Sequence, residues 1–269
     1  MSYPIYMLAA LSAIEWSQVT WRLEEAPDAG TAECEQEMIH DVLLRHLPRQ
    51  GLSVDAGCGT GKWPIYLARR GYRVVGLDIS LEAGRTARVT DRNVPMTVGD
   101  VRRIPLRDRS LDAVISLGVV EHDERGPLEA LREARRVLKP DGVLVLSVPY
   151  NNPFRRLVVN RLQTYVTWKR RRAGMKLGLL EYRFSKREVR HFLAETGFEP
   201  LAAYPNDFLP PRNVGLWVDH QNLVFNPLHE HVPGELFRLP GLAGRVAVAV
   251  TRHAPWLVCG EVAFVARAC

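Results

Sequence analysis

Cysteine is scarce in this sequence, and its four copies lie far apart. None of Cys34, Cys58, Cys259 and Cys269 belongs to a C-x-x-C pair, and their spacing is irregular. Zinc ribbons need closely spaced cysteine pairs, and disulfide-stapled domains need a regular cysteine framework. The sequence therefore indicates neither class, and we expect reduced thiols in an intracellular protein.

Long apolar runs are also absent. A membrane-spanning helix needs about 18 uninterrupted apolar residues. The nearest candidate, 241–259, is interrupted by Arg245, Arg252 and His253. The N-terminal stretch MSYPIYMLAALSAIEW has no basic residues ahead of its apolar part, which argues against a secretory signal. We expect a cytoplasmic protein and leave open peripheral binding at the inner membrane face.

Lysine is scarce as well, because the basic residues are almost all arginine. Lysine occurs only at positions 62, 139, 169, 176 and 186. The formal net charge of +6 suggests a polyanionic partner, but the arginine bias can equally reflect genome base composition. The 46% of hydrophobic and 25% of charged residues exclude a disordered chain, and 269 residues are enough to bury a large core.

The sequence does contain a regular alternation of strand and helix patterns. Apolar runs predict strands at 53–56, 72–78, 95–100, 111–117 and 142–149, with helical patterns between them. This alternation predicts βαβ crossovers and a doubly wound, Rossmann-like α/β sheet of parallel strands. Ligands of such sheets bind at the carboxyl ends of the strands.

Three segments fall outside this alternation, at 1–32, 151–180 and 205–259. Segments of this length usually have a function or carry structure of their own. We predict a helical N-terminal arm at 1–32 that acts as a lid, a core at 33–204 and a last sheet strand at 260–269. The arm and the two inserts are expected to form a cap over the site.

A glycine-rich loop follows the first predicted strand. It reads Asp55-Ala56-Gly57-Cys58-Gly59-Thr60-Gly61, and its third glycine comes one residue earlier than in dinucleotide-binding loops. An acid two residues before the first glycine opposes a phosphate and favours a ligand that carries an ammonium and a sulfonium. Asp55 either contacts that ammonium or caps the amides of the loop.

Two more acids end the next two predicted strands. Asp78 lies about 20 residues beyond the loop, where a carboxylate accepts both hydroxyls of a ribose. Asp100 is placed to accept a hydrogen bond from the exocyclic amine of an adenine. Together with the loop, these acids predict a site for an adenosine ligand with a cationic tail.

Three stretches of the sequence carry a family resemblance. They read VDAGCGTGKWPIYLARRGYRVVGLDIS, GDVRRIPLRDRSLDAVISLGVVEH and EARRVLKPDGVLVLSVP. In this order and spacing they resemble the motifs of class I S-adenosylmethionine-dependent methyltransferases, and most closely the branch with a type 11 methyltransferase domain. The resemblance covers about residues 35–204 and implies a seven-stranded sheet whose last strand, 262–267, is antiparallel.

The resemblance also implies S-adenosylmethionine as the cofactor and a role for each site residue. The loop around the methionine part would consist of Asp55, Gly57, Cys58, Gly59 and Gly61. We interpret Cys58 as a small residue that fits the loop rather than as a nucleophile. Asp141 departs from the family, which often has glycine there, and lies in a predicted turn.

The remaining implied contacts follow the later strands. Asp78 with Ile79 would hold the ribose, and Asp100 with Val101 the adenine. The sulfonium side would be lined by Leu117 and Gly118. His122 would lie near the transferred methyl group, as a general base or as a wall of the pocket. In-line methyl transfer depends on geometry more than on acid–base chemistry, so an obvious base is not required.

A histidine-rich stretch suggests a metal cluster only at first sight. The spacing of His220, His229, Glu230 and His231 fits no firm metal template, so we interpret them as polar loop residues and predict no metal site.

Aromatic residues of the N-terminal arm allow two interpretations. Trp16, Trp21 and Arg22 belong either to a lid whose arginine meets the carboxylate of the ligand or to a helix that only packs.

The segment 151–180 concentrates the positive charge. It has no acid and eight basic residues: Arg155, Arg156, Arg161, Lys169, Arg170, Arg171, Arg172 and Lys176. Leucine, valine, tyrosine and tryptophan interleave with them. This pattern is typical of a helix on an anionic membrane or around an acidic substrate, and a solvated helix explains it equally well.

The function that we predict is methyl transfer to an oxygen, nitrogen or carbon of a small-molecule or lipid-like acceptor. A nucleic-acid (RNA) methyltransferase is the alternative that the charge favours. Enzymes of this fold that methylate amino groups of DNA or RNA typically carry an N/D-P-P-Y motif after the fourth strand. This chain reads SLGVVEH there, which argues against the alternative. A third alternative is a non-catalytic, cofactor-binding partner, against which the intact acids argue. No obligate partner is evident.

Overall fold

The computed structural model describes residues 5–10, 31–207 and 241–269. The chain divides into two compact units. The core unit contains 12–148, 188–204 and 263–269, and the second unit contains 1–11, 149–187 and 205–262.

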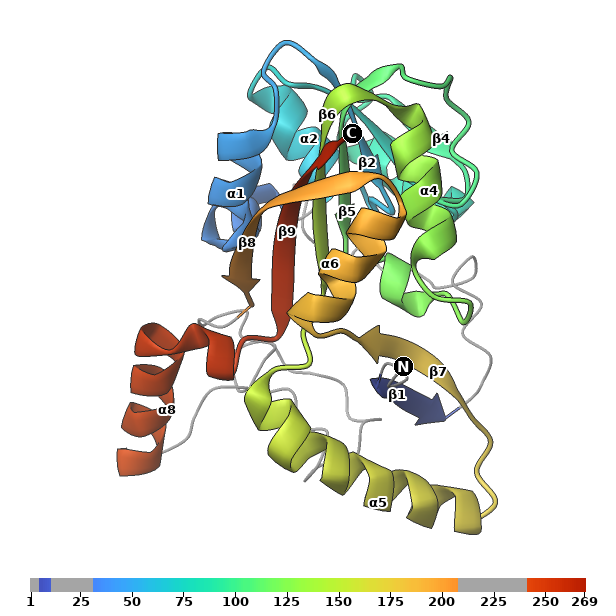
Figure 1. Ribbon diagram of the computed structural model, residues 1–269. Coiled ribbons are helices and arrows are strands. Elements are labelled where there is room, and N and C mark those ends of the chain that lie inside the picture. Colours follow the sequence, from blue (N-terminus) through green and yellow to red (C-terminus); the bar gives the residue numbers. More distant parts are fainter. Residues whose placement is uncertain (1–4, 11–30, 208–240) are drawn as a thin grey trace. The chain divides into compact units, whose positions relative to one another are not determined.

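A seven-stranded sheet forms the centre of the fold (Figure 1), with the order β4-β3-β2-β5-β6-β9-β8. Its strands are β2 (Leu52–Ala56), β3 (Arg73–Asp78), β4 (Met96–Val98), β5 (Leu111–Leu117), β6 (Leu138–Pro149), β8 (Phe198–Asn206) and β9 (Glu261–Ala268). The strands β2 to β6 pair in parallel. The predicted doubly wound α/β sheet is confirmed.

The last strand, β9, runs against its neighbours. The amide of Cys269, after the end of β9, donates to the carbonyl of Gly197, before the start of β8 (3.0 Å). At the other end, the Asn206 side chain donates to Glu261 (3.0 Å). Opposite ends of the two strands meet, so the predicted antiparallel last strand is confirmed.

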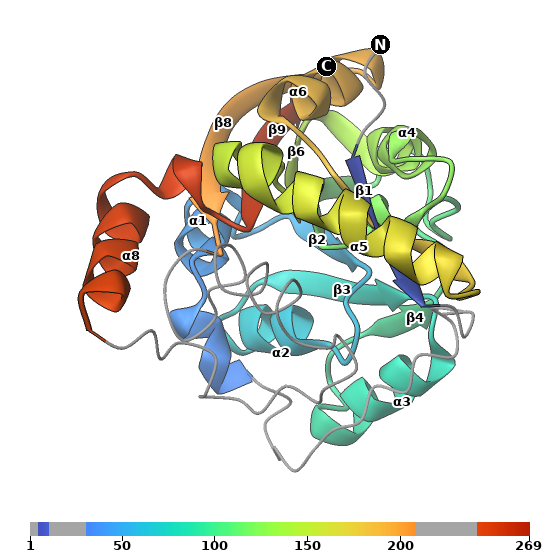
Figure 2. The same ribbon diagram turned by 90° about the horizontal axis from the view of Figure 1, so that it is seen from below.

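Helices cover both faces of the sheet. The helical elements are η2 (Thr31–Gln36), α1 (Ile39–His46), α2 (Lys62–Arg69), α3 (Leu81–Thr90), η3 (Val120–His122), α4 (Leu128–Val137) and α6 (Lys186–Glu195). The apolar stripes of α1 and α2 pack on one face against buried strand residues such as Ile115 and Val145. Figure 2 shows α4 on the other face of the sheet.

The strand β6 begins earlier than predicted, at Leu138 instead of 142. Leu138 pairs with Leu111, and the register then shifts before Val143 pairs with Ala113. Asp141 therefore lies inside β6 and not in the turn predicted for it, and it has φ 62°, in the left-handed region that favours glycine. This conformation is consistent with the glycine that the family resemblance implies at this position.

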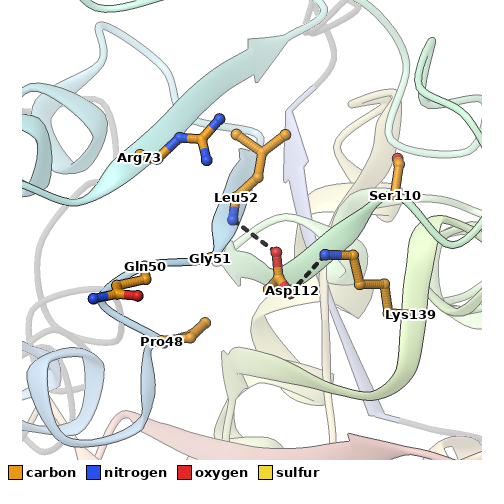
Figure 3. A pocket seen from close by; sticks show the side chains of 8 residues that line it. All are labelled: Pro48, Gln50, Gly51, Leu52, Arg73, Ser110, Asp112 and Lys139. Atoms are coloured by element: carbon orange, nitrogen blue, oxygen red, sulfur yellow. Dashed lines mark hydrogen bonds and ion pairs between the residues drawn. The ribbon is translucent and has the colours of Figure 1, made fainter.

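The amino ends of the strands surround a hollow of about 490 Å³ (Figure 3). Its lining is Pro48, Gln50, Gly51, Leu52, Arg73, Ser110, Asp112 and Lys139. The Asp112 carboxylate accepts hydrogen bonds from the amide of Leu52 and from Lys139, both at 2.8 Å. Asp112 therefore joins the starts of β2, β5 and β6.

We expect Asp112→Asn to lower the free energy of unfolding by about 1–2 kcal/mol at pH 7, because the Lys139 ion pair is lost. The hydrogen bond from Lys139 lowers the pKa of the Asp112 carboxyl. The stabilisation is therefore complete above the unfolded-state pKa of about 4 and is lost as the pH falls through the lower folded-state value. Urea titrations at several pH values measure the effect, and equal stabilities at pH 7 would contradict it.

Within its described residues, the second unit has a small sheet and two long helices. Strand β1 (Ile5–Ala10) pairs antiparallel with β7 (Leu177–Arg183). The helices are α5 (Asn160–Arg172), which follows a π-helical turn, η4 (Arg155–Val159), and α8 (Gly241–His253), which precedes a short 3₁₀ turn, η5 (Pro255–Leu257). None of the helices within the described residues is both long and apolar enough to cross a membrane.

The prediction of a helical arm is wrong for residues 5–10, which form β1. Ile5 and Tyr6 favour a strand, and β7 supplies the hydrogen-bond partner that no local pattern shows. Trp16, Trp21 and Arg22 lie outside the described residues, as do His220, His229, Glu230 and His231. The cap over the site stays a prediction.

The basic insert is more than the single helix that its pattern suggests. Its last residues, 177–180, belong to β7, and Arg155 is not on the surface. Arg155 is 2% exposed and donates to the carbonyls of Tyr150 (2.9 Å) and Gly260 (2.7 Å). This arginine holds the second unit together, so seven basic residues of the insert remain for a surface role.

Candidate functional site

The glycine-rich loop turns the chain from the end of β2 into α2. Gly57, Gly59 and Gly61 have φ values of 90°, 53° and 83°, which glycine adopts without strain. A Cβ on Gly57 would lie 2.4 Å from a methyl carbon of Val119. The loop therefore needs glycine at this position both for its backbone and for its approach to the segment after β5.

The amides of this loop are held by groups other than Asp55. Gly57 and Cys58 both donate to the carbonyl of Leu77, at 2.7 and 3.0 Å, and Gly61 donates to Cys58 (3.0 Å). Gly59 donates to the Asp78 carboxylate (2.8 Å). Asp55 is thus not the cap of these four amides, which favours the other interpretation, contact with a ligand.

Asp55 is a buried carboxyl, only 3% exposed. Burial, and secondly the charge of Asp78, raise its pKa to about 7, while Lys62 opposes the shift. A carboxyl with this pKa gains charge readily when a cation comes within hydrogen-bond distance. The site is therefore electrostatically suited to an ammonium group.

Asp78 connects the loop with the start of α3. Its carboxylate accepts from the amides of Gly59 and Ser80, at 2.8 and 2.9 Å, one on each oxygen. Ser80 in turn caps α3 by accepting a hydrogen bond from the amide of Ala83 (3.2 Å). Each carboxylate oxygen has a second lone pair for a hydroxyl. Next to Asp78, Ile79 is 43% exposed and offers apolar surface to a ligand.

Asp100 lies beside Asp78, because the amide of the preceding Gly99 donates to the Asp78 carbonyl (2.9 Å). Arg102 binds the Asp100 carboxylate through its guanidinium and its own amide, and it also reaches Asp123 (3.1 Å). The hydrogen bonds from Arg102 lower the pKa of Asp100. Val101, between the two, is half-buried.

Sequence reasoning missed Arg102 and Asp123. The only signal was an arginine two residues after a candidate acid, which is too common to be diagnostic. Arg102 leaves Asp100 charged and fixes the orientation of its carboxylate. The side chain of Asp100 is still 30% exposed. An adenine amine would share this carboxylate with Arg102.

The segment after β5 completes the arrangement. Gly118 has φ 68° and donates to the Ser147 carbonyl of β6 (3.1 Å), while Leu117 is half-buried. His122 ends the short η3 turn with its side chain 21% exposed, and its Nε2 lies 3.8 Å from a carboxylate oxygen of Glu121. Glu121 is 2% exposed and was not singled out from the sequence. Both interpretations of His122 stay open.

The structure thus brings the predicted residues to one edge of the core sheet. The loop, Asp78 and Asp100 are linked directly, and Gly57 approaches Val119 of the segment after β5. The three acids at this edge point to a ligand with hydrogen-bond donors and a positive charge.

A family comparison agrees with this arrangement. The model that describes the methyltransferase domain matches residues 54–146, the part of the chain that contains every predicted site residue. Residues 54–146 belong to the methyltransferase domain family. This confirms the family predicted from the sequence motifs.

Two of the relatives each match about a third of this chain. An uncharacterized 37.1 kDa protein in transposon TN4556 of Streptomyces fradiae is 39% identical over 36% of this chain and 30% of its own length. The demethylmenaquinone methyltransferase of Staphylococcus aureus is 36% identical over 36% of this chain and 43% of its own length. The chain therefore spans less than half the length of either relative.

A solved structure extends the likeness beyond the methyltransferase domain. The geranyl diphosphate C-methyltransferase of Streptomyces coelicolor, in complex with Mg²⁺, geranyl diphosphate and S-adenosyl-L-homocysteine, has a TM-score of 0.56 and 16% identity. The match covers 99% of this chain and 92% of that one. At this identity the likeness shows the fold.

Proposed function

We propose that this chain is an S-adenosylmethionine-dependent methyltransferase. The observation that carries the proposal is the link between Asp78 and the glycine loop, with Asp55 and Asp100 at the neighbouring strand ends. This donor set fits an adenosine ligand with an ammonium group. The methyltransferase domain over 54–146 supports the same assignment.

In this proposal each element at the sheet edge has one task. Asp55 receives the ammonium, Asp78 the ribose hydroxyls, and Asp100, oriented by Arg102, the adenine amine. Gly57, Cys58, Gly59 and Gly61 line the methionine part, and the other lining residues are Ile79, Val101, Leu117 and Gly118. The bound sulfonium supplies an activated methyl group, and the residues of this edge orient it for in-line attack. His122 removes a proton from the acceptor or only shapes the pocket.

We propose a small-molecule or lipid-like acceptor. The names of the demethylmenaquinone and geranyl diphosphate enzymes support this class. The sequence SLGVVEH at the end of β5 favours this class over the RNA alternative, because it replaces the N/D-P-P-Y motif expected of a nucleic-acid enzyme. Exposed apolar and basic residues of 151–180 support peripheral binding at the inner membrane face, where a lipid-like acceptor would be met.

Calorimetry with S-adenosylhomocysteine tests the cofactor assignment. We expect micromolar affinity, and no binding by the folded chain would overturn the proposal. Transfer of labelled methyl groups from S-adenosylmethionine to isoprenoid diphosphates, prenylated quinols or RNA then separates the acceptor classes. Labelling of RNA alone would favour the alternative, and cofactor binding without transfer to any acceptor tested would favour the non-catalytic partner.

We expect binding of S-adenosylhomocysteine to release a proton at pH 6 and almost none at pH 8. The reason is the pKa of Asp55 of about 7, which an ammonium partner lowers. As the pH increases towards 7, the affinity for S-adenosylhomocysteine should increase by up to about tenfold per pH unit. Calorimetry in two buffers of different ionisation enthalpy counts the protons.

Two variants identify the group that titrates. The release should disappear in Asp55→Asn and persist in His122→Gln, and the opposite pattern would contradict the prediction. Without ligand, Asp55 lowers stability as the pH rises from its ordinary pKa of 3.8 towards 7, because the unfolded chain loses the proton first. Asp55→Asn should remove this part of the pH dependence.

A further inference from the structure

Helix α5 of the second unit and the turn before it expose large apolar side chains. Leu157 is 64% exposed, Tyr165 61%, Trp168 51% and Leu162 46%. The rings of Tyr165 and Trp168 stack on one another with their centroids 6.0 Å apart, in contact with solvent. Aromatic and aliphatic groups gathered on one helix are unusual on a surface that only meets water.

Basic side chains surround these apolar groups. The exposed ones are Arg156, Arg161, Lys169, Arg171, Arg172 and Lys176. The guanidinium carbon of Arg172 lies 4.8 Å from the Trp168 ring centroid. Because 151–180 contains no acid, nothing in the segment itself neutralises this charge.

Helix α8 repeats the pattern in a part of the chain far away in sequence (Figures 1 and 2). Leu242 and Val246, one turn apart, are 69% and 52% exposed, and Ala249 one turn further is exposed as well. Arg245 and Arg252 are exposed beside them. No acid occurs between 241 and 260.

We propose that α5 and α8 are two separate anchors that bind an anionic bilayer surface. Their apolar side chains enter the boundary between headgroups and acyl chains, while the arginines and lysines meet lipid phosphates. A polyanion such as RNA would use the arginines but gives no account of the exposed Leu157, Leu242 and Val246. Two weak anchors on one chain bind more tightly than either alone.

The proposal goes beyond methyl transfer and does not depend on the cofactor site. Binding of S-adenosylhomocysteine therefore serves as an independent readout. If the cofactor binds while vesicles do not, the surface assignment fails alone. If vesicles bind while the cofactor does not, the proposed function fails alone.

Co-sedimentation of the full chain with vesicles tests the proposal. We expect binding to vesicles of phosphatidylcholine and phosphatidylglycerol, and much weaker binding to phosphatidylcholine alone. Replacing Lys169, Arg171 and Arg172 by Gln should weaken binding at least about tenfold. The matched control replaces Arg85, Arg88 and Arg92 by Gln. These three exposed arginines lie on and just after α3 in the core unit, and their loss should change vesicle binding little.

A second pair of variants tests the contribution of α8 to vesicle binding. Leu242→Ser with Val246→Ser should weaken vesicle binding several-fold, whereas Val89→Ser, at an 81% exposed site of α3, should not. All these side chains are exposed, and thermal unfolding checks that each variant folds.

Besides a failure to bind vesicles, three results would overturn the proposal. They are equal losses in the test and control arginine variants, an α8 variant that binds like the original chain, and release of the chain from vesicles by single-stranded RNA that it binds more tightly.

Discussion

Asp78→Asn is expected to lower the affinity for S-adenosylhomocysteine about 100-fold. In the proposed complex the carboxylate accepts two ribose hydroxyls, and hydrogen bonds to a charged group contribute about 1.5–3 kcal/mol each. The substitution also places an NH₂ group against the amide of Gly59 or Ser80, which now donate to the two oxygens. Calorimetry with the purified variant measures the loss.

Asp112→Asn is the matched control, because it makes the same chemical change at the amino edge of the same sheet. We expect it to leave the affinity unchanged. The 2′-deoxy analogue of the ligand separates a lost ribose contact from a displaced loop: in Asp78→Asn it should bind nearly as well as the parent ligand. A folded Asp78→Asn variant with undiminished affinity would refute the ribose assignment.

Much of this site could be predicted because its signals are local. The loop glycines and the acids that end β2, β3 and β4 stand at fixed places in an alternation of short periodic segments. The parallel sheet then brings the ends of these strands together, and the hydrogen bond from Gly59 to Asp78 is the direct result. The number of strands in the sheet and the antiparallel β9 followed from the family resemblance rather than from periodicity.

The features that escaped prediction depend on partners far away in the sequence. Strand β1 exists because β7, more than 160 residues later, supplies its hydrogen bonds. Arg155 looked like one charge in a basic helix, yet it is buried because the carbonyls of Tyr150 and Gly260 accept from it. Arg102 and Asp123 meet across 21 residues. No local pattern encodes such pairs.

Gly57→Ala is expected to lower the free energy of unfolding by about 2–5 kcal/mol. Part of this loss, about 1–2 kcal/mol, comes from holding an alanine at φ 90°. The rest comes from overpacking, which typically costs about 1–3 kcal/mol, because the new Cβ would lie 2.4 Å from a methyl carbon of Val119. Urea titration measures the total.

Gly71→Ala isolates the backbone part of this loss. Gly71 has φ 83° at the end of α2, and no atom lies within 4 Å of a Cβ built there. We expect that variant to lose only about 1–2 kcal/mol. Adding Val119→Ala to Gly57→Ala should recover part of the difference, since only the Cβ of residue 119 then remains near the new methyl group. If Gly57→Ala and Gly71→Ala lose the same stability, the loop does not press against the segment after β5, and the two halves of the site are not coupled through that contact.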